Sequence, residues 1–150
     1  MLVSVTRIML RSYLHLLPFT CDSLRSAHRA RRTPGFLGGR LMGDGRKAFW
    51  TVTSWSDEAA MKAFRNSDAH LRAMRKLPDW CAEASYTHWE QDTSDLPGVK
   101  EAHRRVRDEG RLSRVRYPSP AHAAGQTAES VCGVRFVKTL RPARRAARSS

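Results

Sequence analysis

Residues 35–55, GFLGGRLMGDGRKAFWTVTSW, place the strongest local constraint on the fold. Two short apolar segments flank a Gly-Asp-Gly sequence at 43–45, and these residue types tolerate the positive φ that a tight turn needs. The segment therefore predicts a β-hairpin. Gly38 and Gly39 lie inside its first strand, where glycines indicate a bulge or a close approach by another backbone. A phosphate-binding loop would lie between a strand and a helix, so the glycines favour a hairpin over a phosphate site.

The first segment of the chain, LVSVTRIMLRSY at 2–13, predicts a strand that is covered on both faces. Its apolar residues fall on both parities of an extended chain, which is typical of strands buried on two sides. One parity carries Leu2, Ile8 and Leu10, and the other carries Val3, Val5 and Met9.

Two helices and a further strand follow from the spacing of apolar and capping residues. The first helix is expected to begin near Thr20 or Asp22, either of which could be its N-cap, and to end before Pro34. The second is expected as one continuous helix over 57–76, which Pro78 stops. The segment ASYTHWEQ at 84–91 is rich in β-forming residues and predicts a fourth strand.

These elements give the order strand, helix, strand, strand, helix, strand, which is the split βαβ arrangement of ferredoxin-like α+β domains. We therefore expect a βαββαβ domain with a four-stranded antiparallel sheet over residues 1–95. Residues 96–122 are expected to form a charged helix and an irregular arm. Residues 123–150 are expected to be a basic, disordered tail because their apolar content is low. Within it, SVCGVRFVK at 130–138 is an alternative candidate for a lone strand.

Two motifs resemble a known family. TPGFLGGRLM follows the first helix, and FWTVTSWSDEAAMKAFRNSDAH contains a strand that ends in Trp and then a capped helix. With these motifs, residues 2–92 resemble the dimeric α/β-barrel superfamily, and specifically its antibiotic-biosynthesis-monooxygenase-like branch. The segment LRSAHRARRTPGFLGG is also similar to spheroidene-monooxygenase-like proteins.

The resemblance implies a homodimer in which two protomers pack their sheets face to face as a dimeric α/β barrel. It also implies that a pocket for a small apolar molecule lies between one protomer's sheet and its helices, since the other sheet face forms the dimer. Monooxygenase-like oxidation of a small apolar or polyphenolic substrate in such a pocket needs only a few polar groups to deprotonate the substrate.

Candidate site residues follow from the helix and strand patterns. His70 lies at the border of the second helix's apolar stripe, and Asn66 lies further towards solvent, so these two are the candidate catalytic residues. Trp50, Tyr86 and His88 are the strand residues whose types suit the lining of a ligand pocket.

Two other functions stay open. One is a non-catalytic barrel that binds a small ligand or haem. Haem-degrading members of the superfamily have a second Trp and a His where this chain has Phe64 and Met74, so a haem ligand would have to be His70, one turn earlier. No cofactor is predicted for the oxygenase, and haem is kept as a possible one. The other function is nonspecific nucleic-acid binding, which rests on the basic tail alone.

The charge balance and composition narrow these functions. The chain has 27 Lys and Arg against 14 Asp and Glu, a net charge of +13. Residues 1–95 carry 14 basic and 10 acidic side chains and residues 96–150 carry 13 and 4, so nucleic acid is an unfavoured partner of the patterned domain. The six histidines show no metal-binding spacing, and the three cysteines show no CxxC pair, which favours a reduced, cytoplasmic setting without a metal. No segment approaches the roughly 20 apolar residues of a membrane span, so no membrane partner is expected.

Overall fold

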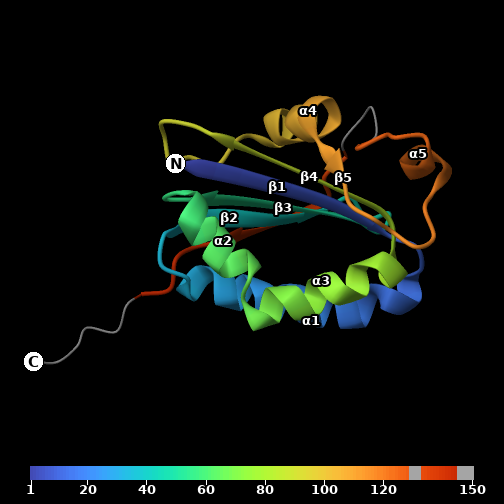
Figure 1. Ribbon diagram of the computed structural model, residues 1–150, viewed down its shortest axis with the longest axis horizontal. Coiled ribbons are helices and arrows are strands. Elements are labelled where there is room, and N and C mark those ends of the chain that lie inside the picture. Colours follow the sequence, from blue (N-terminus) through green and yellow to red (C-terminus); the bar gives the residue numbers. More distant parts are fainter. Residues whose placement is uncertain (129–132, 145–150) are drawn as a thin grey trace, which may run out of the picture.

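A computed structural model describes residues 1–128 and 133–144. Within these residues an antiparallel sheet forms the middle layer, with the strand order β5-β4-β1-β3-β2-β6. Helices α1 and α3 lie on one face of the sheet, and α4 lies on the other (Figure 1). The strands are β1 Leu2–Leu10, β2 Phe36–Gly43, β3 Ala48–Trp55, β4 Cys81–Glu90, β5 Arg111–Leu112 and β6 Phe136–Leu140. The helices are α1 Leu16–Arg32, α2 Glu58–Arg65, α3 Asp68–Trp80, α4 Val99–Glu109 and α5 Pro120–Ala123, with a 3₁₀ turn, η1, at Tyr13–His15.

The predicted ferredoxin-like α+β fold is confirmed. β1, α1, β2 and β3 follow one another as expected, and the helical pair α2 and α3 leads into β4. The sheet of the described residues has six strands rather than four. β5 and β6, both from the chain beyond residue 95, add one strand to each edge.

The central strand β1 is covered on both faces, as its two-sided apolar pattern predicts. Leu2 packs against Ala27 and Ala30 of α1, whereas Val3 and Val5 belong to a separate cluster on the opposite face. Val3 and Val5 are completely buried. At roughly 25 cal/mol per Å² of apolar surface, this burial on both faces is the main contribution of β1 to stability.

The hairpin at 43–45 forms between β2 and β3. The Asp44 carboxylate accepts hydrogen bonds from the backbone N–H groups of Arg46, at 2.7 Å, and Ala48, at 3.2 Å. Gly45 has a φ of +77°, which a glycine adopts without strain. The register between β2 and β3 shifts between Phe36 and Gly38, so the bulge predicted in the first strand is present.

The second predicted helix is two helices. The expectation of one helix over 57–76 is wrong, because α2 ends at Arg65 and α3 begins at Asp68. The intervening Asn66 and Ser67 act as the C-cap of α2 and the N-cap of α3. Asn and Ser favour helix ends because their side chains compete for backbone hydrogen bonds inside a helix.

Two predicted helix boundaries also differ. Pro78 lies in the last turn of α3 and does not stop it, because a proline near a helix end removes one hydrogen bond without preventing the final residues from staying helical. The first helix begins at Leu16 rather than near Thr20. Pro18 lies in its first turn, where the missing N–H has no intrahelical partner to lose.

The chain beyond residue 95 is more ordered than its composition suggests. The predicted charged helix is α4, but the disordered tail expected over 123–150 differs from the structure at β6, which pairs with β2. Leu140 of β6 is 5% exposed and packs into the cluster that contains Trp55. The Phe136 ring lies against Gly43, where it occupies the place of a Cβ atom. Residues 129–132 of the SVCGVRFVK segment and 145–150 of the tail lie outside the described residues.

The sheet face expected to form the dimer is covered in this structure. The face expected to meet a second sheet is covered by the chain's own residues, since Ala102 and Val106 of α4 and Ala128 bury Val52 and Trp50 of β3. The domain boundaries and the homodimer stay predictions, and this sheet face is already occupied by the chain's own residues.

The order of β6 gives the first testable prediction. Leu140→Ala removes a buried side chain that joins β6 to the core, so we expect the free energy of unfolding to fall by about 2 kcal/mol or more. Lys138→Ala on the same strand changes an exposed side chain and is expected to stay within about 0.5 kcal/mol of the wild type. Urea unfolding measures both. Equal stability of the Leu140 variant and the wild type would show that β6 does not dock.

Candidate active site

A cavity of about 500 Å³ lies between the sheet and the helices α1, α2 and α3. Its lining reaches two apolar clusters at opposite ends of β1. Trp55 and Met61 belong to the cluster around Leu2, and Phe49 and Leu77 belong to the cluster around Ile8. This volume lies in the usual range of small-molecule sites. The apolar ends and the open middle give the cavity the form of a slot between sheet and helices.

The floor of the slot consists of two rows of polar side chains that run across three strands. In one row the strand pairing places Tyr86 beside Thr6 and Thr6 beside Thr51. In the other it places His88 beside Ser4 and Ser4 beside Thr53. All six residues line the cavity, and neighbouring side chains of one row lie about 5 Å apart at Cβ. The floor therefore offers a grid of hydroxyl groups with a histidine at one corner.

His70 lies on the helical side of the cavity. Its Nδ1 is 3.0 Å from the carbonyl oxygen of Arg65. A carbonyl only accepts hydrogen bonds, so Nδ1 carries the proton of the neutral ring and Nε2 is the ring's acceptor atom. The ring packs against Phe64, with the centroids 4.7 Å apart. Burial lowers the pKa of His70, and the charge of Arg65 lowers it further, so the ring is neutral at pH 7.

Asn66 lies at the junction of α2 and α3 and also lines the cavity. Its side chain is exposed, so it stands at the rim. Asn66 precedes His70 by four residues in the sequence. It is the C-cap of α2 and lies next to the start of α3. The two candidate catalytic residues therefore share the cavity.

The strand candidates divide between the two faces of the sheet. Tyr86 and His88 line the cavity. Trp50 does not, because the β1–β3 register pairs it with Arg7 and points it to the opposite face. There it is 4% exposed and packs against His103 of α4, with ring centroids 5.5 Å apart. Trp50 is a core residue of the covered face and not a pocket residue.

Several cavity residues did not emerge from the sequence. The floor hydroxyls are present as two short patterns, Ser-Val-Thr at 4–6 and Thr-Val-Thr at 51–53, in which hydroxyl residues alternate with valine. Such an alternation indicates a buried strand with one polar face. It is the pattern from which the floor hydroxyls could have been predicted. No comparable signal identified Asp22, which lines the cavity from α1 and is 4% exposed.

The Asp22 carboxylate joins the two helices that roof the slot. It accepts a hydrogen bond from Lys76 Nζ of α3 at 2.7 Å and one from Arg25 at 3.3 Å. Ser26 of α1 also donates to the Ala69 carbonyl of α3 at 3.5 Å. These contacts fix the spacing of α1 and α3 above the floor.

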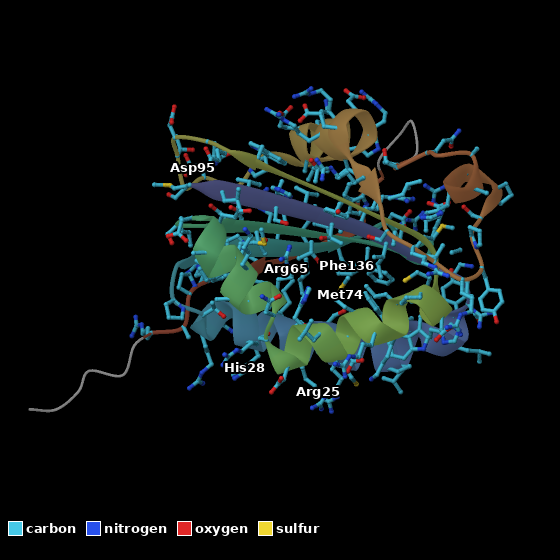
Figure 2. All side chains as sticks on the ribbon, in the orientation of Figure 1. Arg25, His28, Arg65, Met74, Asp95 and Phe136 are labelled. Atoms are coloured by element: carbon cyan, nitrogen blue, oxygen red, sulfur yellow. The ribbon has the colours of Figure 1, made fainter. Side chains whose placement is uncertain are left out.

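The rim of the cavity is open on the α3 side. Met74 and Leu71 both line the cavity while each is 38% exposed. Figure 2 shows Met74 on the side of α3 that faces the sheet, whereas Arg25 and His28 of α1 point outward, away from the slot. An apolar ligand therefore meets apolar side chains where it enters.

Metal and thiol chemistry find little support in the described residues. Residues 1–128 and 133–144 contain no group of three or more His, Cys, Asp or Glu side chains that could hold a metal ion. Cys81 is fully buried, and burial raises the pKa of its thiol to about 12, which excludes a thiolate nucleophile at neutral pH. Among the described helices, none has both the length and the apolar content needed to span a bilayer.

The fold is a ferredoxin-like α+β domain, and a cavity lies between its sheet and its helices. Residues 21–76 match the model of the antibiotic biosynthesis monooxygenase family. The matched residues run from α1 through the hairpin to α3 and so include His70 and Asn66. The resemblance to an antibiotic-biosynthesis-monooxygenase-like domain is therefore confirmed, and the narrower similarity to spheroidene monooxygenases stays a prediction.

Solved structures support the same fold. A putative antibiotic biosynthesis monooxygenase from Nitrosomonas europaea has a TM-score of 0.56 and 14% identity, over 62% of this chain and 100% of that one. SnoaB from Streptomyces nogalater, described as a cofactor-independent oxygenase, has a TM-score of 0.52 and 18% identity, over 65% of this chain and 97% of that one. PA3566 from Pseudomonas aeruginosa has a TM-score of 0.54 and 18% identity, over 61% of this chain and 94% of that one. Identities at this level establish the fold and leave the activity open. No curated protein sequence matches the chain.

The environment of His70 gives the second prediction. We expect its ring to titrate below the ordinary histidine value of about 6.5 in an NMR titration of the folded protein. Phe64→Ala removes the ring that covers it and should move the pKa back towards that value. Because the folded-state pKa is lowered, the contribution of His70 to stability is complete above about pH 6.5 and is lost as the pH falls through the folded-state pKa. A pKa at or above the ordinary value would contradict this description of the site.

Proposed function

We propose that the protein oxidises a small apolar or polyphenolic substrate with molecular oxygen in the slot between the sheet and α1–α3. The observation that carries the proposal is a neutral histidine, His70, which lines a mostly apolar cavity of about 500 Å³ and has its Nδ1 bonded to the Arg65 carbonyl. The match of residues 21–76 to antibiotic biosynthesis monooxygenases and the likeness to SnoaB support it.

Binding of such a substrate follows from the two kinds of surface in the slot. Apolar side chains such as Phe49, Phe64 and Met74 suit the rings of a flat aromatic molecule. The floor hydroxyls and Tyr86 suit the oxygen atoms on its edges, because each hydroxyl both donates and accepts a hydrogen bond. Mostly apolar walls with a few placed polar groups are the usual composition of a small-molecule site.

His70 is the proposed general base. Its Nε2 takes a proton from the substrate, and the Nδ1–H bond to the Arg65 carbonyl holds the ring in the required tautomer while it becomes charged. The resulting substrate anion is electron-rich and donates electrons to oxygen. One oxygen atom is then inserted into a ring C–H bond and becomes a hydroxyl group. The second oxygen atom leaves as water with the two phenolic hydrogens, so the product is a hydroxyquinone. The substrate supplies all the electrons, so no cofactor is required by this reaction.

Asn66 is the proposed second polar group of the reaction. Its amide stands at the rim beside the α2–α3 junction and offers both a donor and an acceptor. A donor near the substrate oxygen stabilises the anion that deprotonation produces. His88 and Tyr86 hold the opposite edge of the substrate on the floor.

A ligand-binding or haem-binding role in the same slot is the alternative. His70 would be the iron ligand, since a hydrogen bond from one ring nitrogen to a carbonyl is the arrangement that orients a metal-ligating histidine. Arg65 also lines the cavity and would pair with an acidic substituent of the macrocycle. Haem would supply oxygen binding at its iron.

Oxygen uptake decides between these functions. We expect the purified protein to consume oxygen with a panel of hydroquinones of one to three fused rings, without added haem. His70→Ala is expected to lower turnover by roughly 10²-fold or more. His28→Ala, on the outward face of α1, is the matched control and should keep the wild-type rate. Turnover should rise with pH through the lowered pKa of His70 and level off above about pH 6.5.

A parallel haem titration separates the alternative. A Soret shift that is lost in the His70 variant, without oxygen uptake, would replace the oxygenase proposal with a haem-binding one. Oxygen uptake that is unchanged in the His70→Ala variant would contradict the assignment of the base.

A further inference from the structure

The sheet face opposite the slot is a second core, and the chain's C-terminal extension completes it. The strands contribute Val3, Val5, Met42, Trp50 and Val52, and the extension contributes Ala102, Val106 and Ala128. Every member of this set is at most 9% exposed. The solved structures cover only 61% to 65% of this chain, so much of its length lies outside the shared domain.

Specific contacts fasten this extension to the sheet along its length. The Arg40 guanidinium donates to the Pro97 carbonyl at 3.0 Å, and the Arg105 guanidinium lies 4.9 Å from the centroid of the Trp89 ring. The Ser85 hydroxyl donates to the Thr127 carbonyl. These contacts begin before α4 and continue after it, so the extension is anchored on both sides of the helix.

A hydrogen bond from the extension reaches a buried ion pair of the sheet. Arg7 of β1 is 2% exposed and pairs with Glu83 of β4, and the Ser119 hydroxyl donates to the other oxygen of the Glu83 carboxylate at 2.7 Å. Backbone bonds from Ser113 to Ala84 and from Ser119 to Ala82, both at 2.9 Å, run beside it. The ion pair itself lies within the sheet, and the Ser119 hydroxyl bonds Oε1 of the carboxylate while Arg7 bonds Oε2.

The outer surface of α4 is unsuited to pack against a second copy. Glu101 bonds both Arg104 and Arg105, and Arg105 also bonds Glu109. Hydrogen bonds from Arg104 and Arg105 lower the pKa of Glu101 to about 2, so this carboxylate stays charged over the physiological range. The extension thus replaces an apolar sheet face with a densely charged helical surface, and charged residues are depleted from the cores of stable interfaces.

We propose that residues 96–128 act as an intramolecular substitute for a partner's sheet and thereby keep this chain monomeric. Without the extension, the face of Val3, Val5, Met42, Trp50 and Val52 would be exposed, and a contiguous apolar patch of that kind drives association. The occupant that fits an uncovered face is a second copy of the same face, because a two-fold axis brings identical apolar strands together. The inference does not rest on the proposed oxidation.

Sedimentation velocity on the full chain tests the proposal. We expect the wild type to sediment at the monomer mass of 17.0 kDa from about 1 to 100 μM. Val106→Glu places a charge at a side chain with 0% exposure and should release α4, so that the variant sediments at twice that mass at the upper concentrations. Lys100→Glu, on the exposed side of α4, is the matched control and should stay monomeric.

A second variant keeps the test decisive if Val106→Glu fails to fold by circular dichroism. Arg105→Ala removes the contact with Trp89 and both carboxylate bonds without burying a charge, and we expect a concentration-dependent dimer. A wild type that sediments as a stable dimer would overturn the proposal. Folded Val106 and Arg105 variants that both remain monomeric at 100 μM would overturn it as well.

Discussion

The central strand β1 has to bury both of its faces, because Leu2 and Ile8 alternate with Val3 and Val5 between two hydrogen-bonded neighbours. One face takes α1–α3, and the other takes α4 with the chain that follows it. The helical layer of α1–α3 and the layer that contains α4 are therefore both needed to bury β1. A single-faced sheet would leave either the slot or the second core open to water.

The slot exists because the side chains in the middle of the sheet are smaller than those at its ends. Trp55 and Phe36 fill the space beneath one end of the helices, and Phe49 and Leu77 fill it beneath the other. Between them β1 and β3 carry serine and threonine, whose side chains are shorter. The Asp22–Lys76 bridge holds α1 and α3 together above this gap. Packing at the ends and polarity at the centre thus produce a space that suits a flat molecule with oxygen atoms.

The two faces of the sheet have different roles, since one lines the cavity and the other is covered by the C-terminal extension. Residues that line the slot come mainly from β1, from the part that matches the monooxygenase family and from β4. Residues that cover the second face come from the extension. β4 connects them, since Tyr86 faces the slot while Ser85 and Glu83 hold the extension. The extension also reaches the slot at one point, because Ser113 is among the cavity residues.

The features that could be predicted from the sequence are those set by residues close together in the chain. Asp44 and Gly45 identified the hairpin, and the two-sided pattern of 2–10 identified a strand with both faces covered. Trp50 was misplaced because strand parity does not say which face the helices cover. Trp50 and Trp55 are five positions apart in one strand and therefore face opposite sides of the sheet, so the two could not both line the same cavity.

The remaining differences come from contacts between residues far apart in the sequence. β6 is ordered because Leu140 pairs with Gly39, a distance of about one hundred residues along the chain, and a short basic segment carries no sign of that partner. The helix break at Asn66 has a local cause, but Asn and Ser inside an apolar periodic stretch are often tolerated in a helix. The structure places His70 at the cavity, and its catalytic role stays a prediction; its tautomer follows from the Arg65 carbonyl, which the sequence could not reveal.

The most direct test of the central claim is a crystal structure of the full chain with a hydroxylated tricyclic quinone, a product-like ligand that does not react further. The account predicts the ligand between the sheet and α1–α3, with a ring oxygen within hydrogen-bond distance of His70 Nε2 and its opposite edge on Tyr86 and His88. A ligand bound elsewhere, or a slot that stays closed to it at saturating concentration, would contradict the claim that this cavity is the active site.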